Sequence, residues 1–88
     1  MPAETTVRVT VRYFAAARAA AGVDDEAVSL PSGATIADLV EALSARGPQL
    51  STVLARCSYL CDGVAVRDKL TVLGDTQTVD VLPPFAGG

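Results

Sequence analysis

Histidine and tryptophan are absent from the 88 residues, and lysine, cysteine, phenylalanine and tyrosine are rare. Without histidine, the Ser/His and Cys/His pairs of nucleophilic catalysis cannot form. Two cysteines also fall short of a closed zinc site. A domain of this length buries only about 60–65% of the surface that its unfolded chain exposes. A large internal pocket would therefore remove hydrophobic packing that so small a fold needs. We therefore expect no metal site, no resident cofactor and no self-contained enzyme.

Basic residues are also few, which limits the classes of molecule that the protein could bind. The net charge is −3, the isoelectric point is about 4.6, and the arginines are scattered rather than gathered into a basic stripe. Nucleic-acid binding is therefore disfavoured. The longest uncharged stretches are shorter than the ~20 residues of a membrane span, and no signal peptide is recognisable. The expected protein is cytoplasmic and has no membrane partner.

The two cysteines, Cys57 and Cys61, fit a reducing compartment. On one strand their sulfurs would share a face but lie about 13 Å apart, too far for a disulfide. We interpret both as small buried hydrophobic residues in a central strand.

Alternating hydrophobic and polar residues predict the first strand. Val7, Val9, Val11 and Tyr13 alternate with arginine and threonine, a period of two that is typical of a half-buried strand. The strand is predicted over 6–14, with the valines toward the core and the arginines in water.

A period near 3.6 predicts the main helix. Ile36, Leu39 and Leu43 fall on one helical face. Thr35 is a natural N-cap for this helix, with Asp38 three residues further on.

The remaining patterns complete an order of elements. The alanine-rich segment 15–21 predicts a short helix that ends at Gly22, and Asp62-Gly63 is a preferred type I′ hairpin pair. The expected elements are strand 6–14, helix 15–21, an acidic loop 24–26, strand 27–30, helix 36–46, one helical turn in 49–56, strands 57–61 and 64–66, and strand 78–82 with Val79 and Val81 inward and Asp80 outward. This order indicates an α+β fold with a mixed sheet covered on one face.

The last six residues, Pro83 to Gly88, form the predicted tail of a single domain over 1–88. Its one reactive group is the Gly88 carboxylate, which has an ordinary pKa of ~3.5 and is ionised at pH 7. Gly87 and Gly88 carry no side chains and can thread a narrow channel. The proline pair Pro83-Pro84 ends the strand and stiffens the base of the tail. The alternative is an ordinary frayed terminus.

Motifs at both ends of the chain resemble a known family. They are Val11-Arg12-Tyr13-Phe14-Ala15 with Arg18, Thr35-Ile36-Ala37-Asp38-Leu39, Asp62-Gly63, Gly74-Asp75, and Leu82-Pro83-Pro84-Phe85-Ala86-Gly87-Gly88. From about Val7 to Gly88, the chain resembles the MoaD family of sulfur carriers, the small subunits of molybdopterin synthase, within the MoaD/ThiS superfamily. The resemblance implies the ubiquitin-like β-grasp fold, with about five strands packed on one main helix and a short second helix.

The resemblance also implies a chemistry. A ubiquitin-activating-type adenylyltransferase (MoeB-like) would adenylate the carboxylate of Gly88, and a sulfur donor protein would convert it to a thiocarboxylate. Residues Pro83, Pro84, Phe85, Ala86 and Gly87 would then enter the large synthase subunit (MoaE-like), which holds the pterin. On this reading the chain is a non-catalytic carrier, and the active site belongs to the large subunit.

A docking surface is expected near the base of this tail. Phe14 has the parity opposite to the core positions of the first strand, and Leu82 points away from Val79 and Val81. If the first and last strands are neighbours, as in the resembled fold, Phe14 and Leu82 share one face and suggest a patch for partner docking. The alternative is that sheet twist or the short helix covers both side chains.

Other functions remain open at this point. The same carrier chemistry serves thiamine thiazole and cysteine synthesis. A ubiquitin-like protein modifier would instead join Gly88 to lysines through isopeptide bonds, and a purely structural β-grasp interaction module is a third possibility.

Overall fold

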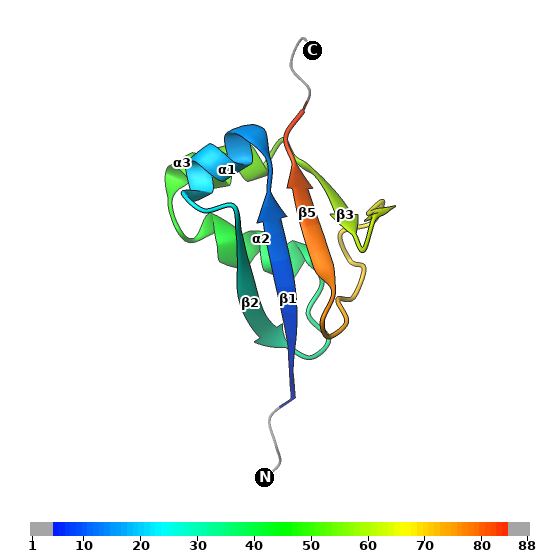
Figure 1. Cartoon of the computed structure of the whole chain (residues 1–88). Coiled ribbons are helices and arrows are strands. Elements are labelled where there is room, and N and C mark those ends of the chain that lie inside the picture. Colours follow the sequence, from blue (N-terminus) through cyan, green and yellow to red (C-terminus); the bar gives the residue numbers. More distant parts are fainter. Residues whose placement is uncertain (1–4, 85–88) are drawn as a thin grey trace.

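A mixed sheet of five strands forms one layer of the molecule, and helices form the other (Figure 1). The computed structural model describes residues 5–84. The strands are β1 (Thr6–Tyr13), β2 (Asp25–Pro31), β3 (Ser58–Cys61), β4 (Val64–Ala65) and β5 (Thr78–Leu82). They lie in the order β2-β1-β5-β3-β4. The central pair β1 and β5 is parallel, and the other neighbouring pairs are antiparallel.

The main helix, α2 (Ile36–Ser44), starts as the sequence predicts. Thr35 accepts a hydrogen bond from the backbone N–H of Asp38, and the Asp38 carboxylate accepts one from the backbone N–H of Thr35. This reciprocal capping box satisfies two donors that a helix start otherwise leaves unpaired. Ile36, Leu39 and Leu43 are buried against the sheet, so the predicted helical face is confirmed. The helix ends two residues earlier than predicted.

Two shorter helices complete the helical layer. The first, α1 (Ala15–Ala21), is confirmed and ends at Gly22, which adopts the left-handed φ of 81°. The helix α3 (Pro48–Leu54) is longer than the single turn predicted. Pro48 at its first turn has its φ already fixed for a helix. Leu50 and Leu54, four residues apart, are both buried and hold the second turn against the core.

The boundaries of β1, β2, β3 and β4 differ from the prediction by one or two residues. The strand β1 stops at Tyr13 because Phe14 is the N-cap of α1. The strand β2 starts at Asp25, where an acidic loop was predicted, since Asp25 pairs in register with Arg12 across the antiparallel ladder. The strand β3 starts at Ser58, which leaves Cys57 outside it.

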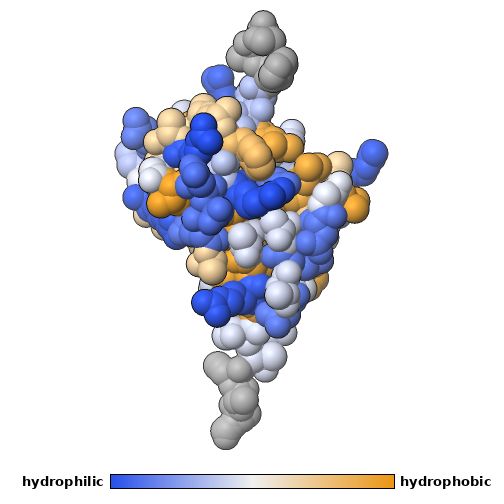
Figure 2. All heavy atoms as spheres, in the orientation of Figure 1, coloured by the Kyte–Doolittle hydropathy of each residue, from blue (hydrophilic) through white to orange (hydrophobic). Residues whose placement is uncertain are grey.

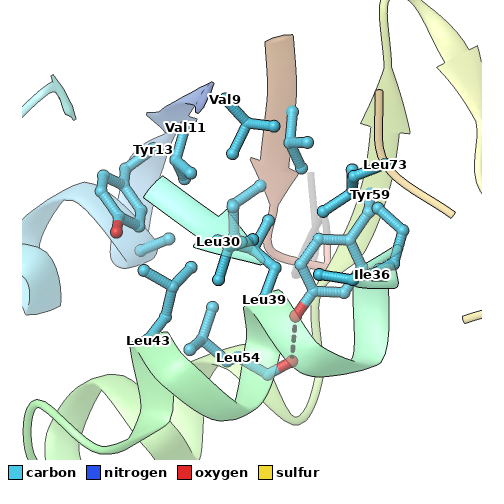
Figure 3. Packing of buried hydrophobic residues seen from close by; sticks show 14 of the residues in the cluster. Val9, Val11, Tyr13, Leu30, Ile36, Leu39, Leu43, Leu54, Tyr59 and Leu73 are labelled. Carbon is cyan, nitrogen blue, oxygen red and sulfur yellow. Dashed lines mark hydrogen bonds between the residues drawn. The ribbon is translucent and has the colours of Figure 1, made fainter. Parts of the chain in front are cut away.

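Valines of β1 and β5 and large side chains of the helices form the core (Figure 3). Val9, Val11, Val79 and Val81 are almost fully buried, as the alternation predicts. The hydroxyl of Tyr59 donates a hydrogen bond to the carbonyl oxygen of Leu54 at 2.9 Å, so the buried phenol has a partner.

The Asp62-Gly63 turn joins β3 to β4 as predicted. Both residues have positive φ, 50° and 83°, which is the signature of a type I′ turn. The helices described in residues 5–84 have seven, nine and seven residues, and each is too short to cross a bilayer.

Candidate functional site

The sheet has an open face, which we define as the face turned away from the helices. An ion pair lies at its centre, between neighbouring parallel strands. The guanidinium of Arg12 donates to both carboxylate oxygens of Asp80, from Nε at 2.6 Å and from Nη2 at 3.0 Å. The Asp80 carboxylate raises the pKa of Arg12. Such a bidentate ion pair fixes the orientation of both side chains.

The structure confirms the predicted outward orientation of Asp80. The residue points away from the core, as its parity requires, but it is only 7% exposed rather than solvated. The Arg12 side chain covers the Asp80 carboxylate and donates the hydrogen bonds that water would otherwise supply. The sequence carried a signal for this pair, because a carboxylate in the middle of a central valine-rich strand needs a cationic partner on a neighbouring strand.

Phe14 and Leu82 lie on the open face at the end of β5. The register pairs Tyr13 with Val81, which places the next residues, Phe14 and Leu82, side by side. Phe14 is 38% exposed, and its backbone N–H donates to the Val81 carbonyl oxygen at 3.3 Å. Leu82 is half-buried. Both side chains are therefore partly accessible, and their role in docking stays a prediction.

Arg12 and Leu60 extend this surface. The Arg12 guanidinium carbon lies 5.7 Å from the centre of the Phe14 ring, within the range of a cation–π contact. Leu60, half-buried on β3, pairs in register with Asp80 and so shares its face. Figure 2 looks onto this face and shows hydrophobic side chains gathered toward the end of β5 and over β3, above a hydrophilic band. An apolar area therefore lies directly beside the start of the tail.

The tail is only partly described. Pro83 is half-buried and Pro84 is exposed, and both follow β5 directly. The other predicted tail residues, Phe85, Ala86, Gly87 and the reactive Gly88, lie outside the described residues 5–84. Their roles stay predictions.

Neither cysteine has the surroundings of a reactive thiol. Both are free and half-buried, and burial raises the pKa of each thiol, whereas reactive cysteines have a lowered pKa. The Cys57 thiol donates to the Val53 carbonyl oxygen at 3.2 Å. The prediction of two buried residues in one strand is only partly right: Cys61 lies in β3, Cys57 precedes it, and both side chains are half-buried. Within residues 5–84, no cluster of three or more potential ligands could hold a metal ion.

A second ionic cluster joins β1, β2 and the end of α2. Both the Tyr13 hydroxyl and the Arg46 guanidinium donate hydrogen bonds to the Glu26 carboxylate. Burial alone would raise the pKa of Glu26, but the hydrogen bonds from Arg46 and Tyr13 outweigh it and hold this pKa below its ordinary value. Burial and the same carboxylate raise the pKa of Tyr13. Glu26 was predicted to lie in a solvated loop. It lies instead in β2, and its hydrogen bond to Arg46 links the sheet to the residues that follow α2.

This cluster predicts a pH dependence of stability. A carboxylate whose pKa falls on folding stabilises the native state above its unfolded pKa, about 4.3 for glutamate, and loses that contribution as the pH falls through its lower folded value. Glu26→Gln should therefore cost about 1 kcal/mol at pH 7, because the partly exposed ion pair is screened by solvent. The difference from wild type should shrink on acidification toward pH 3.

Denaturant unfolding of both proteins at pH 7 and pH 3 measures the effect. Glu41→Gln, on the exposed side of α2, is the matched control and should have little effect at either pH. Equal losses of unfolding free energy in the Glu26 and Glu41 variants would show that the Glu26 cluster makes no specific contribution to stability.

Residues 11–88 match the model of the ThiS family. The chain belongs to this family. The resemblance to the MoaD/ThiS superfamily and its β-grasp fold is thereby confirmed, and the sheet order and the main helix agree with it.

Relatives of this ThiS-family chain include proteins named as a sulfur carrier subunit and as a small archaeal modifier protein. A Chlamydomonas reinhardtii protein named molybdopterin synthase sulfur carrier subunit is 34% identical over 84 residues, which cover 93% of this chain and 100% of the relative. A Pyrococcus furiosus structure described as molybdopterin converting factor, subunit 1, is 34% identical with a TM-score of 0.81, and the match covers 89% of this chain and 98% of the other. Small archaeal modifier protein 1 from Methanosarcina acetivorans is 26% identical with a TM-score of 0.79, over 96% of this chain and 99% of the other.

Proposed function

We propose that this ThiS-family chain is the sulfur carrier subunit of a molybdopterin synthase, and that the carboxylate of Gly88 carries the sulfur. The observation that supports this most strongly is the 34% identity to a named sulfur carrier subunit over that relative's whole length. The order of the last residues agrees with it, since β5 leads through the proline pair toward Gly87-Gly88.

The proposed chemistry activates a carboxylate that is inert by itself. The Gly88 carboxylate attacks the α-phosphate of ATP, so that pyrophosphate leaves and a glycyl adenylate forms. Sulfur from a donor, at the oxidation level of sulfide, attacks the acyl carbon, and AMP leaves with the electron pair of the broken C–O bond. The product is a thiocarboxylate, a soft nucleophile held on an arm that reaches at most ~20 Å beyond the sheet.

The sulfur is then delivered inside a partner. The tail enters the large synthase subunit, and sulfur passes to cyclic pyranopterin monophosphate in two such transfers that build the dithiolene of molybdopterin. The carrier supplies the sulfur and a docking surface, while the pocket around the pterin belongs to the large subunit. Phe14 and Leu82 are the proposed docking residues, because they form an exposed apolar area at the start of the tail.

A second candidate function is protein modification. The 26% identity to a small archaeal modifier protein supports it, and it would use the same adenylate, with a lysine amine in place of the sulfur donor. Sulfur carriage for thiamine thiazole or cysteine synthesis is the third candidate. All of these share the activation step and differ in what receives the acyl group or the sulfur.

A discharge assay separates these candidates. The thiocarboxylated chain is mixed with the large subunit and cyclic pyranopterin monophosphate, and both products are followed by mass spectrometry. We expect the chain to lose about 16 Da as its terminus returns to a carboxylate while the pterin gains sulfur. Omission of the large subunit is the control and should leave the thiocarboxylate in place. A chain that keeps its thiocarboxylate in the presence of the large subunit and cyclic pyranopterin monophosphate would contradict the proposal.

A further inference from the structure

A groove lies on the helical side of the molecule where the tail begins. It encloses about 400 Å³, and its lining comes from α1, α3 and the residues after β5: Ala16, Thr52, Val53, Arg56, Pro83 and Pro84. In Figure 1, α1 and α3 lie beside each other near the end of β5. This tail groove is distinct from the open face, because α1 and α3 belong to the opposite layer.

The chemistry of the lining suits an aromatic ring. The lining is mainly apolar, since it includes Ala16, Val53 and two prolines, and Val53 packs against the core. Arg56 also lines the groove, is exposed, and forms no ion pair with any of the residues 5–84. A guanidinium placed in this way can lie over an aromatic face. The groove therefore offers a ring both apolar contact and a nearby cation.

The chain itself provides a ring at the right place. Pro84 lines the groove, and the next residue is Phe85, the one large apolar side chain among residues 85–88. Successive Cα atoms are 3.8 Å apart, so the ring is within reach without any intervening loop. A phenylalanine side chain buries about 150–250 Å² of surface when it is covered. We propose that Phe85 docks in the tail groove and holds the tail against α1 and α3 while no partner binds it.

This docking would regulate the proposed carrier, and that consequence rests on the proposed function. A partner that takes up the tail must first withdraw Phe85 from the groove. If the ring is docked nine-tenths of the time, the apparent affinity of the partner falls about tenfold, because only the released fraction is competent to bind. The docking itself needs no sulfur chemistry, so it can be tested separately.

Tryptophan fluorescence offers a direct test, because the chain has no tryptophan of its own. Phe85→Trp places a unique reporter in the full-length protein. We expect its emission to be blue-shifted and shielded from acrylamide, compared with a free peptide of residues 83–88 that carries the same substitution. Adding Thr52→Glu or Ala16→Glu, both at exposed lining positions, should shift the emission back toward that of the peptide.

The matched control is Ala42→Glu, the same change at an exposed position of α2 that does not line the groove. It should leave the blue shift unchanged, and far-UV circular dichroism should show that all variants are folded. An emission equal to that of the peptide would overturn the proposal. So would a blue shift that neither groove substitution reverses, because the ring would then be buried elsewhere.

Discussion

Removal of Gly88 is expected to lower thiocarboxylate formation at least about 100-fold while the melting temperature stays nearly unchanged. The deletion leaves a carboxylate on Gly87, about 3.3–3.6 Å short of its position in the full chain, and a misplacement of even 1 Å can cost about 100-fold in rate. The core ends before the tail, since Val81 is the last fully buried residue of β5. Loading with ATP, activating enzyme and sulfur donor, followed by intact-mass analysis, measures the effect.

Replacement of the two thiols is the control for this experiment. Cys57→Ala and Cys61→Ala should keep thiocarboxylate formation, because both thiols have a raised pKa and carry no assigned chemistry. Each should cost about 1 kcal/mol of stability or less, since the side chains are only half-buried. A folded Cys61→Ala protein that no longer carries sulfur would contradict the assignment to Gly88.

Leu82→Asp is expected to weaken binding to the large synthase subunit more than tenfold, about 1.4 kcal/mol. A carboxylate at this position would be desolvated in an apolar interface without a partner. Leu82 lies beside Phe14 at the start of the tail, where apolar contacts at the centre of an interface carry most of its energy. The monomer should remain folded, because Leu82 is only half-buried.

Titration calorimetry and a melting curve on each variant separate binding from folding. Ser29→Asp is the matched control, since Ser29 is exposed on the same open face at β2 and pairs in register with Arg8, away from the tail. Equal weakening by both variants would indicate a net-charge effect. Unchanged affinity in a folded Leu82→Asp protein would show that the docking surface lies elsewhere.

Local patterns in the sequence predict most of the architecture, because they report local physics. The alternation from Val7 to Tyr13 defines a strand with one buried face, and Thr35 with Asp38 defines a helix start, whatever the rest of the chain does. Asp62-Gly63 specifies its turn through backbone conformation alone. The expectation that the first and last strands are neighbours came instead from the family resemblance, since no pattern within one strand reveals its neighbour.

The features that could not be predicted depend on contacts between distant segments. The outward direction of Asp80 was predicted but its burial was not, because its own strand does not identify Arg12, 68 residues away in sequence, as the partner that covers it. Glu26 was placed in a loop because a run of acidic residues is usually solvated, whereas here Arg46 and Tyr13 hold it. The second turn of α3 was missed because its stability comes from burying Leu50 and Leu54. The tail groove follows from the packing of α1 on α3, which no pattern in either helix indicated.

The intact mass of the chain after incubation with ATP, an activating enzyme and a sulfur source tests the central claim most directly. The proposed function predicts a gain of about 16 Da, as sulfur replaces one oxygen of an ordinary carboxylate, and fragmentation should place that gain on Gly88. An unchanged mass under conditions where the enzyme forms the adenylate would contradict it. So would an added mass that persists on the chain after Gly88 is removed.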